Sequence, residues 1–129
     1  MNIIIKDGKF GNSSTEIADG TMEISSDTPI HEILNQIGCV PLLRITFPTS
    51  ADGRGFSIAK SLRQRGYKGH LRAYGHLLAD QYPLAIRCGF DDIEISSELA
   101  SRQPEQQWTD SYIRTQNSYQ EKLGVPVRA

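Results

Sequence analysis

The feature that most constrains the fold is residues 42–96, where apolar strand-like runs alternate with helix-like runs. The strand-like runs cover residues 42–47, 71–75 and 92–96, and the two helical runs between them are closed by Gly66 and Gly89. Links this short between strands and helices imply right-handed crossovers and parallel pairing. The pattern therefore predicts an α/β fold with a βαβαβ core and a small, mainly parallel sheet flanked by helices.

Two details of this core refine the prediction. The run of residues 40–47 is almost continuously apolar, which is typical of a strand buried on both faces, so we expect three layers. The second helical run, residues 77–87, contains Pro83. If that helix begins near Ala79 or Asp80, Pro83 lies in its first turn, where a missing N–H group costs little.

The flanking segments predict smaller elements. Residues 2–5 read as a short strand before a turn at Asp7-Gly8, a second short strand covers 21–24, and a helix over 30–37 ends at Gly38. Trp108 and Tyr112 could dock a C-terminal helix. The 129 residues suit a single domain, 1–129, with a core over 42–96 and a helical tail over 97–129.

Charge is distributed unevenly along the chain. The formal net charge is −1, yet residues 42–87 hold eight Lys and Arg residues against two acidic ones. A basic core in an acidic frame suits a small anionic ligand or an acidic protein surface. Nucleic acid is disfavoured, because no basic stripe is interleaved with aromatic residues. There is no apolar run of about 20 residues and no signal-like N-terminus, so we expect no membrane span and a cytoplasmic location.

The residues that usually hold metals or cofactors form no recognisable pattern. Cys39 and Cys88 are not a closely spaced pair, and we interpret both as free thiols acting as small buried hydrophobic groups. Three scattered histidines give no metal signature. The chain also lacks phosphate-binding and dinucleotide-binding glycine fingerprints. No metal and no cofactor is therefore evident from the sequence.

Polar residues follow the first two core strands, where a parallel sheet places ligands at its carboxyl edge. Arg54 and the free N–H groups of the helix start after it could bind an anion. His76 could donate a proton, oriented by the neighbouring carboxyl group. The candidate ligand-binding residues are Asp52, Arg54, Ser57, His76, Asp80 and Gln81. No catalytic residue can be assigned.

A structural interpretation of the same residues stays open. Asp52 could simply cap its helix and pair with Arg54, and Asp80 could cap the next helix while His76 is an ordinary loop residue. His70 begins a strand, on the opposite edge of the sheet, and is not expected to take part.

One spaced string of residues stands out, and it consists of Asp52-Gly53-Arg54-Gly55-Phe56-Ser57, Ala59, Leu62, Arg63, Tyr67, Gly69, Leu71-Arg72-Ala73, Gly75, Asp80-Gln81 and Arg87-Cys88-Gly89-Phe90-Asp91. This string resembles a bacterial family of unknown function, labelled as probable oxidoreductases and usually encoded beside the sulfite reductase gene. The resemblance implies a link to assimilatory sulfite reduction but carries over no catalytic residues.

Three functional hypotheses follow. The first is an accessory protein of sulfite reduction that binds an oxyanion, or sulfite reductase itself, through a basic face at the strand ends. The second is a small oxidoreductase with a borrowed cofactor. The third is a structural or assembly partner with no small-molecule site. The sequence leaves open whether the protein is a homo-oligomer.

Overall fold

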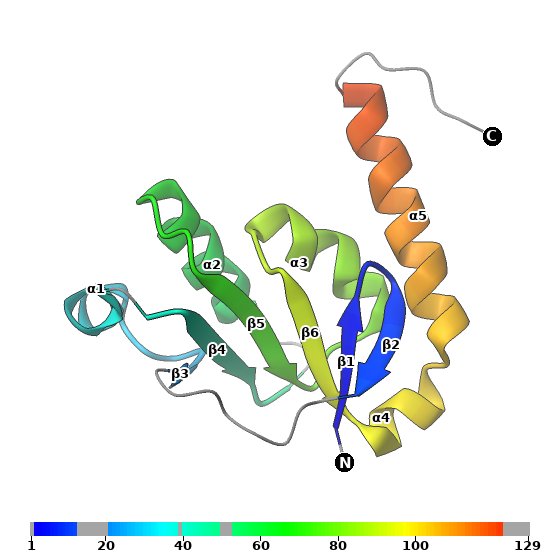
Figure 1. The fold of residues 1–129 in the computed structure, drawn as a ribbon, viewed down its shortest axis with the longest axis horizontal. Helices are drawn as coiled ribbons and strands as arrows, with labels where there is room; N and C mark the ends of the chain where they lie inside the picture. The colour runs from blue at the N-terminus through cyan, green and yellow to red at the C-terminus, as the bar shows by residue number, and fades with distance from the viewer. Residues whose placement is uncertain (1, 13–20, 39, 50–52, 123–129) are drawn as a thin grey trace.

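The computed structural model describes residues 2–12, 21–38, 40–49 and 53–122, with the backbone alone for residues 12 and 117–122. Strands and helices alternate as the core pattern predicts (Figure 1). The elements are β1 (Asn2–Lys6), β2 (Lys9–Asn12), β3 (Thr21–Ser25), α1 (Ile30–Ile37), β4 (Leu42–Phe47), α2 (Arg54–Gln64), β5 (His70–Gly75), the 3₁₀ turn η1 (Ala79–Gln81), α3 (Tyr82–Cys88), β6 (Asp92–Ser96), α4 (Ser97–Arg102) and α5 (Glu105–Lys122).

The sheet has six strands in the order β2-β1-β6-β5-β4-β3. Strands β3 to β6 are parallel neighbours, and β1 and β2 extend the sheet as an antiparallel hairpin. The α/β class and the mainly parallel sheet are confirmed. The short strand predicted at 21–24 is a full member of the sheet, so four consecutive carboxyl ends lie along one edge.

The helical layer packs on one face of the sheet. Helices α2, α3 and α5 contact one another in sequence, and Ile33 and Ile37 of α1 belong to the same buried core as Leu43, Ile45 and Leu62. Leu62 is completely buried and Lys60 is exposed, as the helical spacing predicts. Pro83 lies in the first turn of α3, which begins at Tyr82 after η1.

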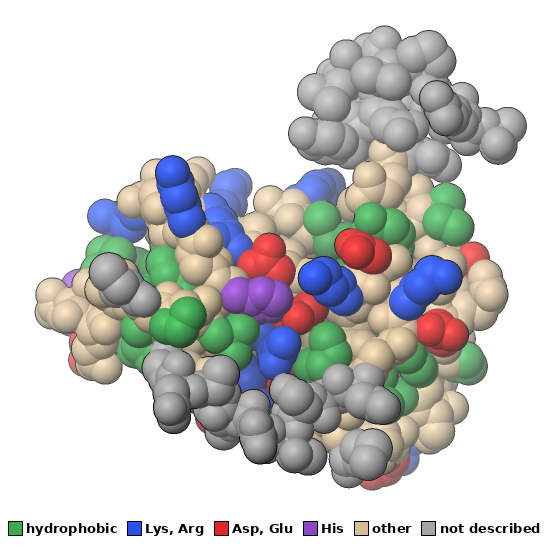
Figure 2. Space-filling model, viewed as in Figure 1, with side chains coloured by type: hydrophobic (Ala, Val, Ile, Leu, Met, Phe, Trp, Pro, Cys, Tyr) green, Lys and Arg blue, Asp and Glu red, His purple; other side chains and the backbone are tan. Residues whose placement is uncertain are grey.

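The expectation of three layers is wrong for the described part of the chain. Every second residue of β4 is buried, beginning with Leu43, while Arg44 faces the other side together with Arg72, Asp92 and Glu94 of the next two strands. Figure 1 looks onto this second face, and no described helix crosses it. In the same view, Figure 2 shows acidic, basic and histidine side chains gathered over the middle of the sheet. The period of two was hidden by Leu42, which is apolar but lies on this polar face.

Candidate functional site

A cavity of about 520 Å³ lies at the carboxyl edge of the parallel strands. It draws residues from the ends of β3, β4, β5 and β6 and from the start of α2. Four of its residues, Ser25, Thr46, Tyr74 and Ser96, face the side of the sheet away from the helical layer. The lining consists of Ser25, Ser26, Asp27, Thr46, Phe47, Pro48, Arg54, Tyr74, Gly75, His76, Ser96 and Leu99.

Gly75 places His76 at this cavity. The backbone of Gly75 has φ +124°, and a Cβ atom there would lie 2.4 Å from the carbonyl oxygen of Phe47. The close approach lets the His76 N–H group donate to that oxygen at 3.1 Å. A larger residue would combine backbone strain with a steric clash, so glycine is required where β5 turns toward the cavity.

Gly55 performs a similar task for Arg54. A Cβ atom on Gly55 would lie 2.4 Å from the ring of Phe47, so the first turn of α2 can rest directly on that ring. Gly53, the N-cap residue, has no side chain to cap the helix. The first turn of α2 thus begins at a residue that lines the cavity. Backbone N–H groups in the first turn of a helix can donate hydrogen bonds to an anion.

The end of β3 forms a wall of the cavity, and none of its residues is among those predicted from the sequence to bind a ligand. Asp27 is the acidic side chain among the described lining residues, and its Oδ1 accepts a hydrogen bond from the Ser25 hydroxyl. The Oγ atoms of Ser25 and Thr28 lie 3.2 Å apart. Residues 25–28 form a strand-to-helix junction like the others. Assigning β3 to the parallel sheet would have pointed to them.

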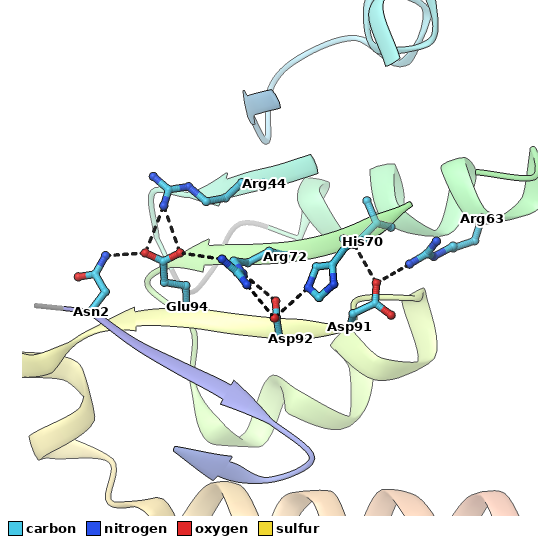
Figure 3. Close-up of polar contacts among 9 residues, drawn as sticks. Asn2, Arg44, Arg63, His70, Arg72, Asp91, Asp92 and Glu94 are labelled. Atoms are coloured by element: carbon cyan, nitrogen blue, oxygen red, sulfur yellow. Dashed lines mark hydrogen bonds and ion pairs between the residues drawn. The ribbon is translucent and has the colours of Figure 1, made fainter. Parts of the chain in front are cut away.

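Tyr74 forms a wall of the cavity, and its ring stacks against the charged side chain of Arg44. The guanidinium carbon of Arg44 lies 4.0 Å from the centre of the Tyr74 ring. Arg44 in turn donates to both carboxylate oxygens of Glu94 (Figure 3) and pairs with Glu23 at 3.1 Å. A guanidinium fixed on both sides restricts the ring that it stacks against.

The same face of the sheet carries a second acidic centre at Asp92. Arg72 donates to both of its oxygens at 2.9 and 3.0 Å, and His70 Nε2 lies 2.9 Å from Oδ2 (Figure 3). Burial would raise the pKa of Asp92, but His70 and Arg72 outweigh burial and hold the pKa below its usual value.

The structure separates the residues that the sequence grouped. Arg54 and His76 meet at the cavity, whereas Ser57, Asp80 and Gln81 are not among its lining residues. Ser57 is exposed on α2, and Gln81 accepts the Leu78 N–H group through Oε1 at 2.9 Å, which caps η1. Asp80 is exposed on η1. Asp52 lies outside the described residues, so its capping of α2 stays a prediction.

Arg63, in the last turn of α2, serves the opposite edge of the sheet. Its guanidinium donates to the carbonyl oxygens of Tyr67, Gly69 and Gly89 at 2.9–3.0 Å and pairs with Asp91 at 2.8 Å. The Asp91 carboxylate also accepts the Leu71 N–H group (Figure 3). This cluster joins α2, β5 and the end of α3.

The Arg63 cluster contains much of the residue string that the sequence analysis singled out. Gly89 has φ +104°, and a Cβ atom there would lie 2.4 Å from the Arg63 side chain. These residue types are therefore required for packing and backbone hydrogen bonding, and no ligand is needed to explain them.

The charge pattern of the sequence also has a structural explanation. Arg44, Arg63 and Arg72, all from the basic stretch 42–87, pair with acidic residues outside it. Their partners are Glu23, Asp91, Asp92 and Glu94. These pairs therefore neutralise part of the basic core.

Of the two cysteines, Cys88 lies within the described residues. Cys88 is buried, as interpreted from the sequence, and burial raises the pKa of its thiol while Lys60 and Arg87 act in the other direction. Cys39 lies outside the described residues.

No group of three or more His, Cys, Asp or Glu side chains capable of holding a metal ion occurs in the described part of the chain. Nor is any helix there long and apolar enough to cross a membrane.

Comparison with known families identifies the relationship that the residue string indicated. The model of the family described as "Bacterial protein of unknown function (DUF934)" matches residues 21–127. The chain belongs to this family. The match includes β3 to β6, and with them every described residue that lines the cavity. No curated protein and no solved structure matches the chain.

Proposed function

We propose that this DUF934 protein is a cytoplasmic accessory protein of assimilatory sulfite reduction that binds an oxyanion group in the carboxyl-edge cavity. One observation carries the binding proposal. Arg54, His76 and the start of α2 come from two successive strand-to-helix junctions and line one cavity. The link to sulfite reduction rests on the residue string that resembles proteins encoded beside the sulfite reductase gene.

Charge and hydrogen bonding favour an anion at this place. Arg54 supplies a permanent positive charge, and the first turn of α2 adds N–H donors and the positive end of a helix dipole. Asp27 opposes an anion, because the hydrogen bond that it accepts from the Ser25 hydroxyl leaves the negative charge of the carboxylate in place. We expect the oxyanion group to sit beside Arg54 and His76, which adjoin β4 and β5, rather than beside Asp27, which follows β3.

Titration of the purified protein with sulfite and with sulfate, followed by calorimetry, tests the binding. Arg54→Ala should weaken oxyanion binding by about 1–3 kcal/mol, the range for a charge-assisted hydrogen bond. The matched control is Arg87→Ala, which removes an exposed arginine on α3, outside the cavity, and should leave binding unchanged. If Arg54→Ala unfolds the protein without a separable binding defect, Arg54 has a structural role and the oxyanion site is rejected.

A pull-down from sulfate-grown cells tests the biological link. Co-purification of sulfite reductase with the wild-type protein, reduced by Arg54→Ala and retained by Arg87→Ala, would support a partner contact through the same edge. Absence of the reductase under conditions that retain its known subunit contacts would count against the accessory role. A coloured or fluorescent purified protein would instead favour an oxidoreductase with its own bound cofactor.

A further inference from the structure

We propose that the ligand of the carboxyl-edge cavity is an organic molecule with a single anionic group, in which one carboxylate, sulfonate or phosphate group is attached to an apolar body. This inference rests on the proposed function, because it names the class of ligand that the same cavity binds.

The size of the cavity is the first argument. The cavity has a volume of about 520 Å³. A bare sulfite ion, with one sulfur and three oxygen atoms, would leave most of that space to water. The volume instead falls in the range of about 300–1,000 Å³ that is typical of sites for organic ligands.

The walls of the cavity are the second argument. Phe47, Pro48, Tyr74 and Leu99 provide apolar surface around the residues that can bind an anion. Apolar walls with a few convergent polar groups are typical of sites that bury an organic body and orient it by one charged end. An inorganic oxyanion would gain nothing from these four side chains.

The third argument is that the principal aromatic wall is fixed in place. The Arg44 guanidinium lies against the Tyr74 ring, and Glu23 of β3 and Glu94 of β6 both hold that guanidinium. A ring that is already ordered loses little conformational freedom when a ligand packs on it. Tyr74 therefore provides a preformed surface for a planar or compact apolar group.

Charge count limits the ligand to one anionic group. Among the described lining residues, Arg54 is the sole Lys or Arg, and Asp27 contributes a carboxylate. A ligand with several phosphate groups would place further negative charge near Asp27 without a matching cation. One anionic head beside Arg54 and His76, with an apolar body toward Tyr74 and Leu99, satisfies both constraints.

A series of sulfonates with one head group and a growing body tests the inference by calorimetry. The ligands are methanesulfonate, benzenesulfonate and naphthalenesulfonate, measured beside sulfite. We expect affinity to rise along the series, with naphthalenesulfonate roughly tenfold or more tighter than methanesulfonate, because burial of the rings adds apolar contact. The heat capacity change should become more negative along the same series. Naphthalenemethanol, which has the rings without the charge, should bind roughly tenfold or more weakly than naphthalenesulfonate.

Variants locate the effect. Leu99→Ala and Tyr74→Ala should each weaken naphthalenesulfonate roughly fivefold more than they weaken methanesulfonate. Leu84→Ala, which shortens an exposed leucine on α3 outside the cavity, is the control and should change neither affinity. Circular dichroism of each variant verifies the fold, and the ligand series on the wild-type protein needs no variant at all.

The outcomes separate the two proposals. Equal affinity for all three sulfonates and for sulfite would overturn the organic-ligand inference and leave the oxyanion site standing. No binding of sulfite or of any sulfonate would overturn both. Equal affinity for naphthalenemethanol and naphthalenesulfonate would show an apolar cavity without anion selectivity, which also contradicts both.

Discussion

The two ends of helix α2 place an arginine at opposite edges of the parallel sheet. At the start of the helix, Arg54 lines the carboxyl-edge cavity with His76. In the last turn, Arg63 donates to three backbone carbonyl oxygens and pairs with Asp91. One helix thus carries an arginine that we propose binds a ligand and an arginine whose hydrogen bonds maintain the fold.

The two arginines differ in role because the two edges of the sheet differ in structure. At the amino edge, carbonyl oxygens at the end of α3 and before β5 need donors, because those chain ends do not complete a regular ladder. At the carboxyl edge, Gly55 and Gly75 bring two junctions close to Phe47 and leave a cavity beyond it. Substitutions along α2 and at the adjoining strands can test whether these roles are separate.

Leu62→Ala should have the largest effect on stability. Leu62 is completely buried between the two ends of α2, so removing its side chain should lower the free energy of unfolding by about 2–4 kcal/mol. Lys60→Ala, two residues earlier and exposed, should change it by less than about 0.5 kcal/mol. Chemical denaturation measures both. Equal losses for the two variants would mean that the buried face of α2 is assigned wrongly.

Arg63→Ala should lower the free energy of unfolding by about 2–3 kcal/mol, because three carbonyl oxygens and Asp91 lose a shared donor. Arg63→Lys keeps the charge but not the branched guanidinium, so it should recover a minor part of that loss. Oxyanion affinity of the folded Arg63→Ala protein should match the wild type. A selective loss of affinity at unchanged stability would contradict the division between the two edges.

Asp92→Asn tests the charges at the first residue of β6. The pKa of Asp92 is lowered in the folded protein, so its ionised form stabilises the fold above the usual aspartate pKa of about 3.9. This contribution is lost as the pH falls through the lower, folded-state pKa. We expect Asp92→Asn to cost about 1–2 kcal/mol at pH 7 and to make unfolding below about pH 4 less dependent on pH.

Denaturation at a series of pH values measures the Asp92 effect. Equal pH dependence of the wild type and Asp92→Asn would show that other carboxyl groups control acid unfolding. Glu98→Gln is a suitable control, because the Glu98–Arg102 pair is exposed on both sides and should contribute little.

Arg54→Ala should have a small effect on stability, within about 0.5 kcal/mol of the wild type, while it weakens oxyanion binding by about 1–3 kcal/mol. This result would complete the contrast with Arg63→Ala. Thermal unfolding with and without sulfite measures both properties in one experiment, since a ligand that binds the folded state raises the melting temperature. Loss of stability without loss of the sulfite-induced shift would reverse the assignment.

Local patterns predicted a good part of this arrangement. The apolar periodicity and the closing glycines predicted β4, β5, β6 and the two core helices, because these signals depend on residues within one or two turns. The rule for parallel strands also indicated that Arg54 and His76 would share an edge. The same reasoning grouped Gln81 with them, whereas its side chain caps η1.

The sequence by itself determined the α/β class, the positions of the core strands and the edge at which polar residues collect. The tertiary structure decided which face of the sheet no described helix covers, that β3 supplies a wall of the cavity, and which arginine maintains the fold. The physical reason is distance along the chain. Arg63 donates to the Gly89 carbonyl, 26 residues away, and Arg44 donates to Glu94, 50 residues away. These contacts can form only after the strands have assembled into the sheet.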